Sequence, residues 1–204
     1  PLYGLKVFSS NSVYSIFDRV NITLKVVDDR INVGSVASIT FIAIYEYDKL
    51  DANLYTTPTF NDTLTKTTVG RFSYRISSIR ESQHGLTSLA ANAVSVIFDR
   101  VRIVGFDVSD NRTSIGREEK ATVKAVLEYD NSPLGAGDVV KVNNTHALWD
   151  DSAKSFWIPF KLDKVGRLNF VVNEAQHEGY NITVFYNPRG VKSIIWDRVA
   201  VTIE

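Results

Sequence analysis

Apolar and polar residues alternate in short runs along this chain of 204 residues. The alternation is clearest over residues 71–76, 122–129 and 168–172, where every second side chain is apolar. A period of two is typical of β-strands that have one face on a core and one face in water. No window has the spacing of an amphipathic helix, and Gly, Asn, Asp and Pro gather between the runs, where turns need them. The pattern therefore predicts an all-β chain of short antiparallel strands that pack as sandwiches.

The chain contains internal repeats. The string FDRV at residues 17–20 returns at 98–101, and WDRV stands at 196–199. Residues 3–20 and 84–101 are identical at 9 of 18 positions, and residues 180–199 form a third, longer copy. There are three copies of this closing segment but two copies of the body between them. One closing strand is therefore surplus, and we place it at the N-terminus.

The bodies of the repeats also match. VVDDRINVG at 26–34 lies over VSDNRTSIG at 108–116, and Glu-Tyr-Asp follows in both at 46–48 and 128–130. The second body has an additional hairpin around residues 149–157. Together with the PLGAGD turn at 133–138, these motifs resemble the immunoglobulin-like repeats found in tandem on secreted and cell-surface proteins of archaea and bacteria.

The resemblance implies two tandem immunoglobulin-like antiparallel β-sandwich domains plus an N-terminal extra strand segment. We expect residues 1–20 to be the closing or donor strand of a preceding repeat or of a neighbouring subunit. Residues 21–101 then form the first repeat and residues 102–204 the second. Such sandwiches serve as spacers, adhesins, lattice units and enzyme accessories alike. The resemblance therefore predicts the fold of each repeat but not its function.

Charge and composition limit which partners and which kinds of site the chain can have. Lys and Arg number 23 and Asp and Glu number 23, so no net charge favours nucleic acid or an anionic membrane as a partner. No apolar run reaches the roughly 20 residues of a membrane-spanning helix. Cys and Met are absent, which excludes disulfides and thiolate metal sites and indicates that a chain starting at Pro1 is processed or excised.

Five sequons add to this picture, and we expect an extracellular or cell-surface location. The glycosylation candidates are Asn21, Asn61, Asn111, Asn143 and Asn181. Asn61, Asn111 and Asn143 lie in or beside turn signals, whereas Asn21 and Asn181 lie in runs that read as strands. We predict that the three turn sites are modified first.

The sequence offers little material for catalysis. His84, His146 and His177 stand in unrelated positions, and no catalytic or phosphate-binding motif occurs. We therefore predict that the chain is not an enzyme and needs no cofactor. The acidic pairs Asp28-Asp29, Asp107 with Asp110, and Asp150-Asp151 lie in turns, and calcium there or at the joint between repeats is the alternative to plain solvated turns. A solvent-facing Trp157 would suit stacking on a surface glycan.

The Asp-Arg pair at the end of each closing segment recurs where one repeat passes into the next. The joint candidates are Asp18, Arg19, Asp99, Arg100, Asp197 and Arg198. An Arg guanidinium can hold carboxylates in a fixed orientation and so set the angle of the joint. A charged edge that blocks stray strand pairing is the other interpretation.

The surplus strand suggests how copies could associate head-to-tail. Its apolar assembly residues are Leu5, Val7, Phe8, Val13, Ile16 and Phe17. We predict a non-enzymatic extracellular structural protein, a unit of a surface layer or of a filament assembled by strand exchange between copies. The alternatives are an adhesin segment and a carbohydrate-binding accessory module of a secreted hydrolase. Equally, the chain is an excerpt of a longer array, in which a preceding body receives the strand.

Overall fold

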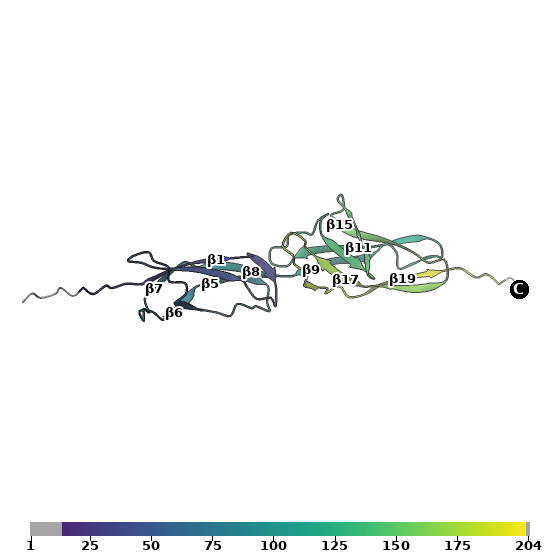
Figure 1. Cartoon of the computed structure of the whole chain (residues 1–204). Coiled ribbons are helices and arrows are strands. Elements are labelled where there is room, and N and C mark those ends of the chain that lie inside the picture. The colour runs from purple at the N-terminus through teal and green to yellow at the C-terminus, as the bar shows by residue number, and fades with distance from the viewer. Residues whose placement is uncertain (1–13, 203–204) are drawn as a thin grey trace, which may run out of the picture.

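The computed structural model describes residues 14–202 and contains β-strands with no helix among them. The strands form two β-sandwiches that lie end to end as a rod (Figure 1). The first contains β1 (Val20–Val26), β2 (Arg30–Asn32), β3 (Ile39–Tyr45), β4 (Thr56–Phe60), β5 (Gly70–Tyr74), β6 (Ile76–Glu81), β7 (Leu89–Ala91) and β8 (Val94–Asp99). The second contains β9 (Val101–Val108), β10 (Arg112–Ser114), β11 (Glu118–Leu127), β12 (Val139–Val142), β13 (Thr145–His146), β14 (Leu148–Asp150), β15 (Ser155–Lys161), β16 (Gly166–Phe170), β17 (Val172–Gln176), β18 (Phe185–Tyr186) and β19 (Lys192–Asp197).

The second sandwich has the immunoglobulin-like arrangement. One layer has the strand order β14-β15-β11-β9-β18, and the opposite layer combines β13-β12-β17 with β10-β19-β16. β16 and β17 are separated by Val171 alone and form one bent strand, where the sequence predicts an unbroken one. β10 crosses to the second layer and pairs in parallel with the last strand, β19.

The first sandwich repeats this plan with one omission. β3-β1-β7 forms one layer, and β2-β8-β5 with β4-β6 forms the other. β5 and β6 bend at Arg75 as β16 and β17 do at Val171. In the described residues no named strand pairs with the outer side of β3, because this sandwich has no counterpart of the hairpin β14–β15 that covers β11. Residues 50–53 bond this edge at Ala43 and Tyr45, so the edge of β3 is open over residues 39–41.

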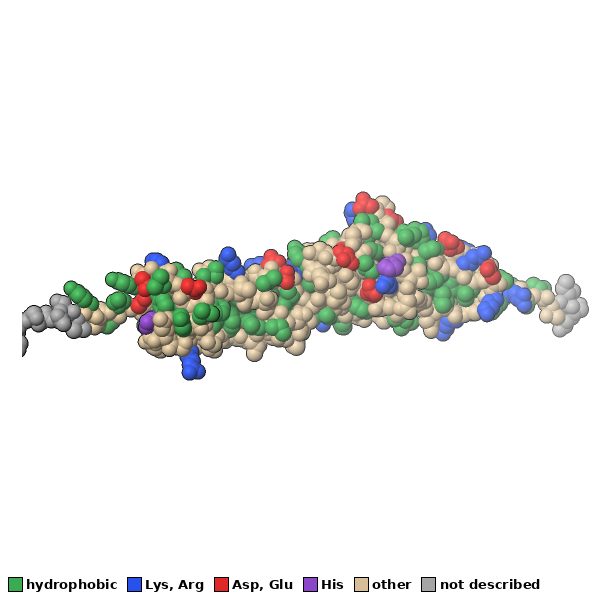
Figure 2. Space-filling view, viewed as in Figure 1, with side chains coloured by type: hydrophobic (Ala, Val, Ile, Leu, Met, Phe, Trp, Pro, Cys, Tyr) green, Lys and Arg blue, Asp and Glu red, His purple; other side chains and the backbone are tan. Residues whose placement is uncertain are grey.

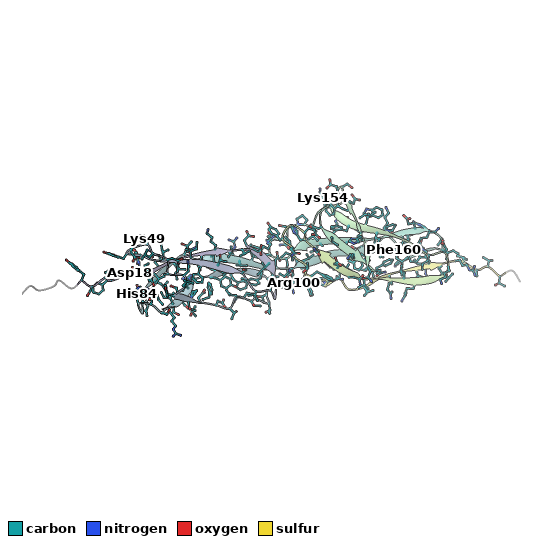
Figure 3. All side chains as sticks on the ribbon, viewed as in Figure 1. Asp18, Lys49, His84, Arg100, Lys154 and Phe160 are labelled. Atoms are coloured by element: carbon teal, nitrogen blue, oxygen red, sulfur yellow. The ribbon has the colours of Figure 1, made fainter. Side chains whose placement is uncertain are left out.

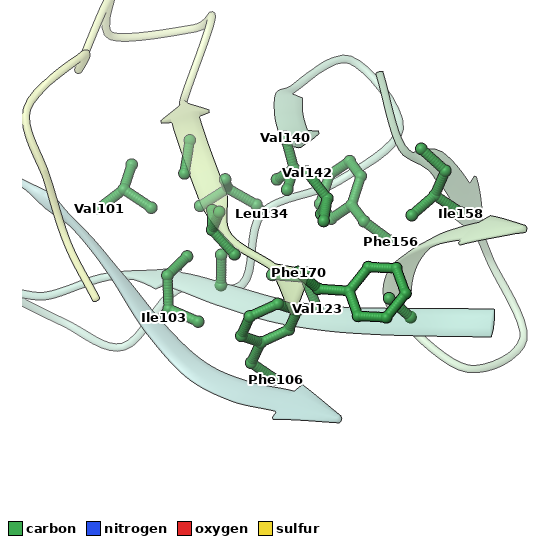
Figure 4. Packing of buried hydrophobic residues seen from close by; sticks show 14 of the residues in the cluster. Val101, Ile103, Phe106, Val123, Leu134, Val140, Val142, Phe156, Ile158 and Phe170 are labelled. Atoms are coloured by element: carbon green, nitrogen blue, oxygen red, sulfur yellow. The ribbon is translucent and has the colours of Figure 1, made fainter. Parts of the chain in front are cut away.

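Burial follows the alternation seen in the sequence. Along β11 every second residue from Glu119 to Leu127 is buried, and those from Ala121 onward meet Phe106, Phe156 and Phe170 in the core of the second sandwich (Figure 4). The first sandwich has two smaller clusters, around Ile22 and around Phe98. The burial of these apolar faces is the main force that stabilises both sandwiches.

The equivalence of the repeats is visible in their last strands. Phe98 on β8 and Trp196 on β19 are both fully buried, and the Trp196 Nε1–H donates to the Arg117 carbonyl at 2.9 Å. The turns after β2 and β10 both contain a glycine with positive φ, Gly34 at 84° and Gly116 at 79°, a conformation that side chains disfavour. No helix in residues 14–202 is long and apolar enough to cross a membrane.

Candidate functional site: the joint between the sandwiches

The two sandwiches are linked by a single residue. β8 ends at Asp99 and β9 begins at Val101, so the structure places the passage at Arg100, one residue before the boundary that the sequence analysis drew. Asp99 Oδ1 accepts hydrogen bonds from the backbone N–H of Arg100 at 2.8 Å and of Tyr129 at 3.0 Å. The Arg100 guanidinium pairs with Glu128 at 2.5 Å. A linker this short and this well bonded leaves little freedom between the sandwiches.

Arg30 crosses the joint from β2 of the first sandwich. Its side chain is 6% exposed and lies between two carboxylates, with Nε 3.6 Å from Asp99 Oδ2 and Nη2 2.6 Å from Asp130 Oδ2. The guanidinium carbon also lies 4.8 Å from the ring centroid of Tyr180 and 5.7 Å from that of Tyr129. Asp130, Tyr129 and Tyr180 belong to the second sandwich. We call the group formed by Asp99, Tyr129, Asp130 and Tyr180 the Arg30 socket.

Asn32 makes the second set of bonds across the joint. Its Oδ1 accepts from the backbone N–H of Thr183 at 2.8 Å and of Val184 at 2.9 Å. Its Nδ2 donates to the carbonyl of Asn181 at 3.1 Å. Arg30 and Asn32 are the first and last residues of β2 and point the same way, because alternate residues of a strand share a face. The short strand β2 therefore carries both bonded contacts.

Burial and charge shift the pKa values of the two carboxylates of the socket, Asp99 and Asp130, in opposite directions. Burial raises the pKa of Asp99 above its ordinary value, although two backbone N–H donors and Arg30 act against it. Burial also acts to raise the pKa of Asp130, but the Arg30 guanidinium and Ser132 outweigh it and hold the pKa at about 2. Both directions follow from removing a carboxylate from water and then giving it a cation and donors.

A groove of ≈ 680 Å³ runs beside this contact. Residues 26–32 of the first sandwich line one wall, and residues 178–181 of the second line the other. The groove has no group of three or more His, Asp or Glu side chains placed to hold a metal ion, and no such group occurs elsewhere in residues 14–202. Asp99 and Asp130 face the Arg30 guanidinium, whereas Asp28 and Asp29, which lie in the groove and were considered for calcium, are exposed.

The six Asp-Arg candidates lie at three equivalent places. Asp18 Oδ1 accepts from the N–H of Arg19 at 2.8 Å and of Tyr47 at 3.0 Å, as Asp99 does from its partners. Arg19 pairs with Glu46 as Arg100 pairs with Glu128. The Arg19 pair raises the pKa of the guanidinium. The same contacts therefore recur at both places, and their effect on the angle of the joint stays a prediction.

At the other end of the chain the arrangement is less complete. Asp197 Oδ1 accepts from the N–H of Arg198 at 2.8 Å, and Asp197 Oδ2 lies 3.8 Å from Arg112 on β10. Arg112 occupies the position of Arg30 but is 66% exposed. Within the described residues no further sandwich follows β19, so the Arg112 side chain has no socket to contact.

The predicted assembly strand lies mostly outside the described residues, namely at Leu5, Val7, Phe8 and Val13. Ile16 and Phe17 are described, and they are exposed and outside any strand. Phe17 is 95% exposed, whereas its counterparts Phe98 and Trp196 are fully buried. The segment that ends at Asp18 therefore resembles β8 and β19 in sequence, while the side chains of Ile16 and Phe17 are exposed.

The sequons lie in several settings. Asn61 and Asn111 are exposed beside strands, and Asn21 is half-buried within β1. Asn143 lies in a turn, but its Nδ2 donates to the Asn169 carbonyl at 2.8 Å. Asn181 was expected in a strand and instead lies in an exposed turn with φ of 51°, where its carbonyl accepts from Asn32.

The remaining candidates stay apart from one another. The ring of His84 contacts Tyr45, and His177 stacks on Tyr180. His146 is exposed on β13. Trp157, which we expected to face solvent, is half-buried and its ring is covered by the Lys120 ammonium at 4.5 Å. No pair of these side chains is positioned to act together on a substrate.

Sequence reasoning missed Arg30, Asn32, Asp130 and Tyr180 as joint residues. A signal existed for Arg30, because it stands in the repeated motif VxDxRxxxG, with Arg112 in the other copy. Asp130 likewise belongs to the repeated Glu-Tyr-Asp. Asn32 had no such signal, since Ser114 takes its place in the second repeat.

Comparisons with known proteins give coarse results. No protein-family model matches the chain, and no curated protein matches it. Among solved structures, the adhesin InvE of Yersinia pseudotuberculosis aligns with a TM-score of 0.31 and 14% identity over 88% of this chain and 59% of that one. The Escherichia coli adhesin FdeC aligns with a TM-score of 0.31 and 13% identity over 93% and 66%. The chain thus spans less than two thirds of either structure, and similarity this low assigns no family.

Proposed function

We propose that the chain is a non-enzymatic spacer segment of an extracellular surface protein, whose task is to hold its two ends at a fixed separation and orientation. The observation that carries the proposal is the joint. A one-residue linker, a nearly buried arginine between two carboxylates and three hydrogen bonds of Asn32 join the sandwiches. Contacts of this kind oppose inter-domain swing, which is otherwise the default for sandwiches in series.

A stiff rod suits a filament or surface layer and also the stalk of an adhesin. Lys, Arg, Asp and Glu are scattered over the visible face of the rod, with no large area of one charge (Figure 2). This supports a role in spacing more than one in capturing a charged partner. Both versions place the chain outside the cell, which agrees with five sequons and no cysteine.

Strand exchange between copies is the finer proposal for a filament. Residues 3–18 resemble β8 and β19 in sequence. In the two described sandwiches β8 and β19 already occupy their positions, with a partner strand on each side. An added strand would instead pair with residues 39–41 on the outer edge of β3, beside the part of that edge that residues 50–53 already bond. Deleting residues 1–13 should then abolish polymers and leave both sandwiches folded. Polymers that persist after the deletion would refute strand exchange.

The location is tested on native material. Antibodies against the rod should label intact cells as strongly as permeabilised cells, and peptides that carry the sequons should show glycan masses. Labelling that requires permeabilisation would contradict the proposal.

Electron microscopy of the released protein distinguishes a filament from a stalk. Ordered polymers would indicate a filament, and single rods would indicate a stalk.

A further inference from the structure

The exposed end of the first sandwich carries a second copy of the Arg30 socket. Asp18, Tyr47, Asp48 and His84 correspond to Asp99, Tyr129, Asp130 and Tyr180 of the joint. His84 and Tyr180 each stand five residues before the start of their next strand, β7 and β18. These four residues, which we call the N-terminal socket, line one pocket of ≈ 460 Å³.

Backbone geometry supports the equivalence. Asp48 Oδ1 accepts from the N–H of Leu50 at 3.0 Å, as Asp130 Oδ1 accepts from that of Ser132 at 3.1 Å. Glu46 N–H donates to the Arg19 carbonyl at 2.9 Å, as Glu128 N–H does to the Arg100 carbonyl at 3.0 Å. Figure 3 shows Asp18 and His84 together at the end of the rod, far from Arg100 at the joint.

The opposite end of the rod carries the matching arginine. Arg112 begins β10 as Arg30 begins β2, and both strands pair in parallel with the last strand of their sandwich. The two arginines also lie at similar distances from the last carboxylate, 3.8 Å for Arg112 to Asp197 and 3.6 Å for Arg30 to Asp99. Arg112 therefore has the position of Arg30 without a socket to enter.

We propose that the N-terminal socket binds the Arg112 guanidinium of a second copy, so that copies join head-to-tail through the same chemistry that joins the two sandwiches. The carboxylate of Asp48 takes the role of Asp130, and the rings of Tyr47 and His84 take those of Tyr129 and Tyr180. An arginine suits this site because its planar, always charged group can pair with a carboxylate and stack on an aromatic ring at once.

The backbone around the contact differs from the internal joint in one respect. In the second copy, Asp18 and Arg19 already hold the places that Asp99 and Arg100 hold at the joint. The first copy's Asp197 and Arg198 must therefore turn aside. Arg198 is exposed and outside any strand, whereas Asp197 ends β19, so the rearrangement gives up the last pairing of that strand, between Asp197 and Ser114.

Sedimentation analysis of variants at low ionic strength tests the contact, which rests on the self-association part of the proposed function. Wild-type chain should associate with increasing concentration up to about 1 mM. Arg112→Asp alone and Asp48→Arg alone should each weaken association by about tenfold or more, because each places like charges in the contact. The double variant, Arg112→Asp with Asp48→Arg, should recover association, since the ion pair is restored in reverse.

The recovery distinguishes a lost contact from a lost fold. Arg75→Asp is the matched control, because Arg75 is exposed between β5 and β6 and the same charge change there should leave association unaltered. A wild-type chain that stays monomeric, or single variants that associate as well as wild type, would overturn the proposal. Failure here leaves the stiff joint untouched, because joint stiffness is measured on the monomer. Deletion of residues 1–13 separates this contact from strand exchange, since the socket remains in the shortened chain.

Discussion

Replacing Arg30 by methionine is the sharpest single test of the joint. Methionine keeps an apolar stem for the aromatic rings but removes the charge. Asp99, which is fully buried, then has no cation at 3.6 Å, and Asp130 has none at 2.6 Å. Removing one partner of a buried ion pair costs about 3–5 kcal/mol, and because Asp130 is 39% exposed we expect a smaller loss, about 2–3 kcal/mol.

The matched control is Arg112→Met. Arg112 has the same place on the equivalent strand, but it is 66% exposed and 3.8 Å from its carboxylate. Loss of a surface pair of this kind costs about 0–1 kcal/mol. The comparison therefore isolates the effect of burial at the joint from the effect of losing an arginine.

Urea unfolding of the dilute monomer gives the measurement. The chain has three Trp residues, Trp149, Trp157 and Trp196, and all belong to the second sandwich. Tryptophan fluorescence therefore follows that sandwich, while circular dichroism follows both. We expect Arg30→Met to shift chiefly the transition that fluorescence does not detect, because Arg30 and Asp99 lie in the first sandwich. Equal free energies of unfolding for the two variants would refute the reasoning.

Three further predictions concern the joint and the surface. Asn32→Ala should widen the distribution of inter-sandwich angles in small-angle scattering and lower the free energy of unfolding by about 1–2 kcal/mol, because it leaves backbone groups at the joint without partners. An unchanged distribution of angles would count against the role of these bonds. Asp130, whose pKa is about 2 against an ordinary 3.8, stabilises the closed joint above pH 3.8 and loses this contribution as the pH falls toward 2, so the rod should loosen in that window. Asp99, whose pKa burial raises, acts with the opposite sign, so the control is Asp130→Asn; a variant that loosens as much as wild type between pH 3.8 and 2 would contradict the prediction. In native material we expect glycans at Asn61 and Asn111 before Asn143, because the Nδ2 of Asn143, the atom that would carry the glycan, already donates to the Asn169 carbonyl. Peptide mass spectrometry that finds Asn143 the most occupied would contradict this.

Patterns with a period of two predict strands well and contacts between sandwiches poorly. The alternation over residues 122–129 foretells the buried face of β11, because that face depends only on which side chains point to the core. β2 has three residues and β18 has two, which is too short for any alternation to register. Yet these short strands form the joint.

Internal repeats carry information that periodicity lacks. Among the three Asp-Arg pairs, Asp99-Arg100 lies where one described sandwich passes into the next, and the other two pairs lie at the outer ends of the two sandwiches. They do not reveal that Arg30, 69 positions before Asp99 in the sequence, enters the same contact. That pairing depends on β2 lying parallel to β8, a feature of the folded sandwich with no local signature.

Turn conformations were the other source of error. Asn181 stands in the apolar run YNITVF, which reads as a strand, but it has a positive φ in a turn whose backbone faces Asn32. Asparagine tolerates this conformation better than most residues. The demands of the joint, and not the local alternation, therefore decide the conformation at this position.

The central claim is that the two sandwiches form one stiff unit, and residual dipolar couplings of the monomer test it most directly. The couplings of residues 20–99 and of residues 101–197 should fit a single alignment tensor, with the relative orientation that the Arg30 and Asn32 contacts impose. Two tensors of clearly different magnitude would mean that the sandwiches reorient independently, and the account of the chain as a rigid spacer would then be wrong.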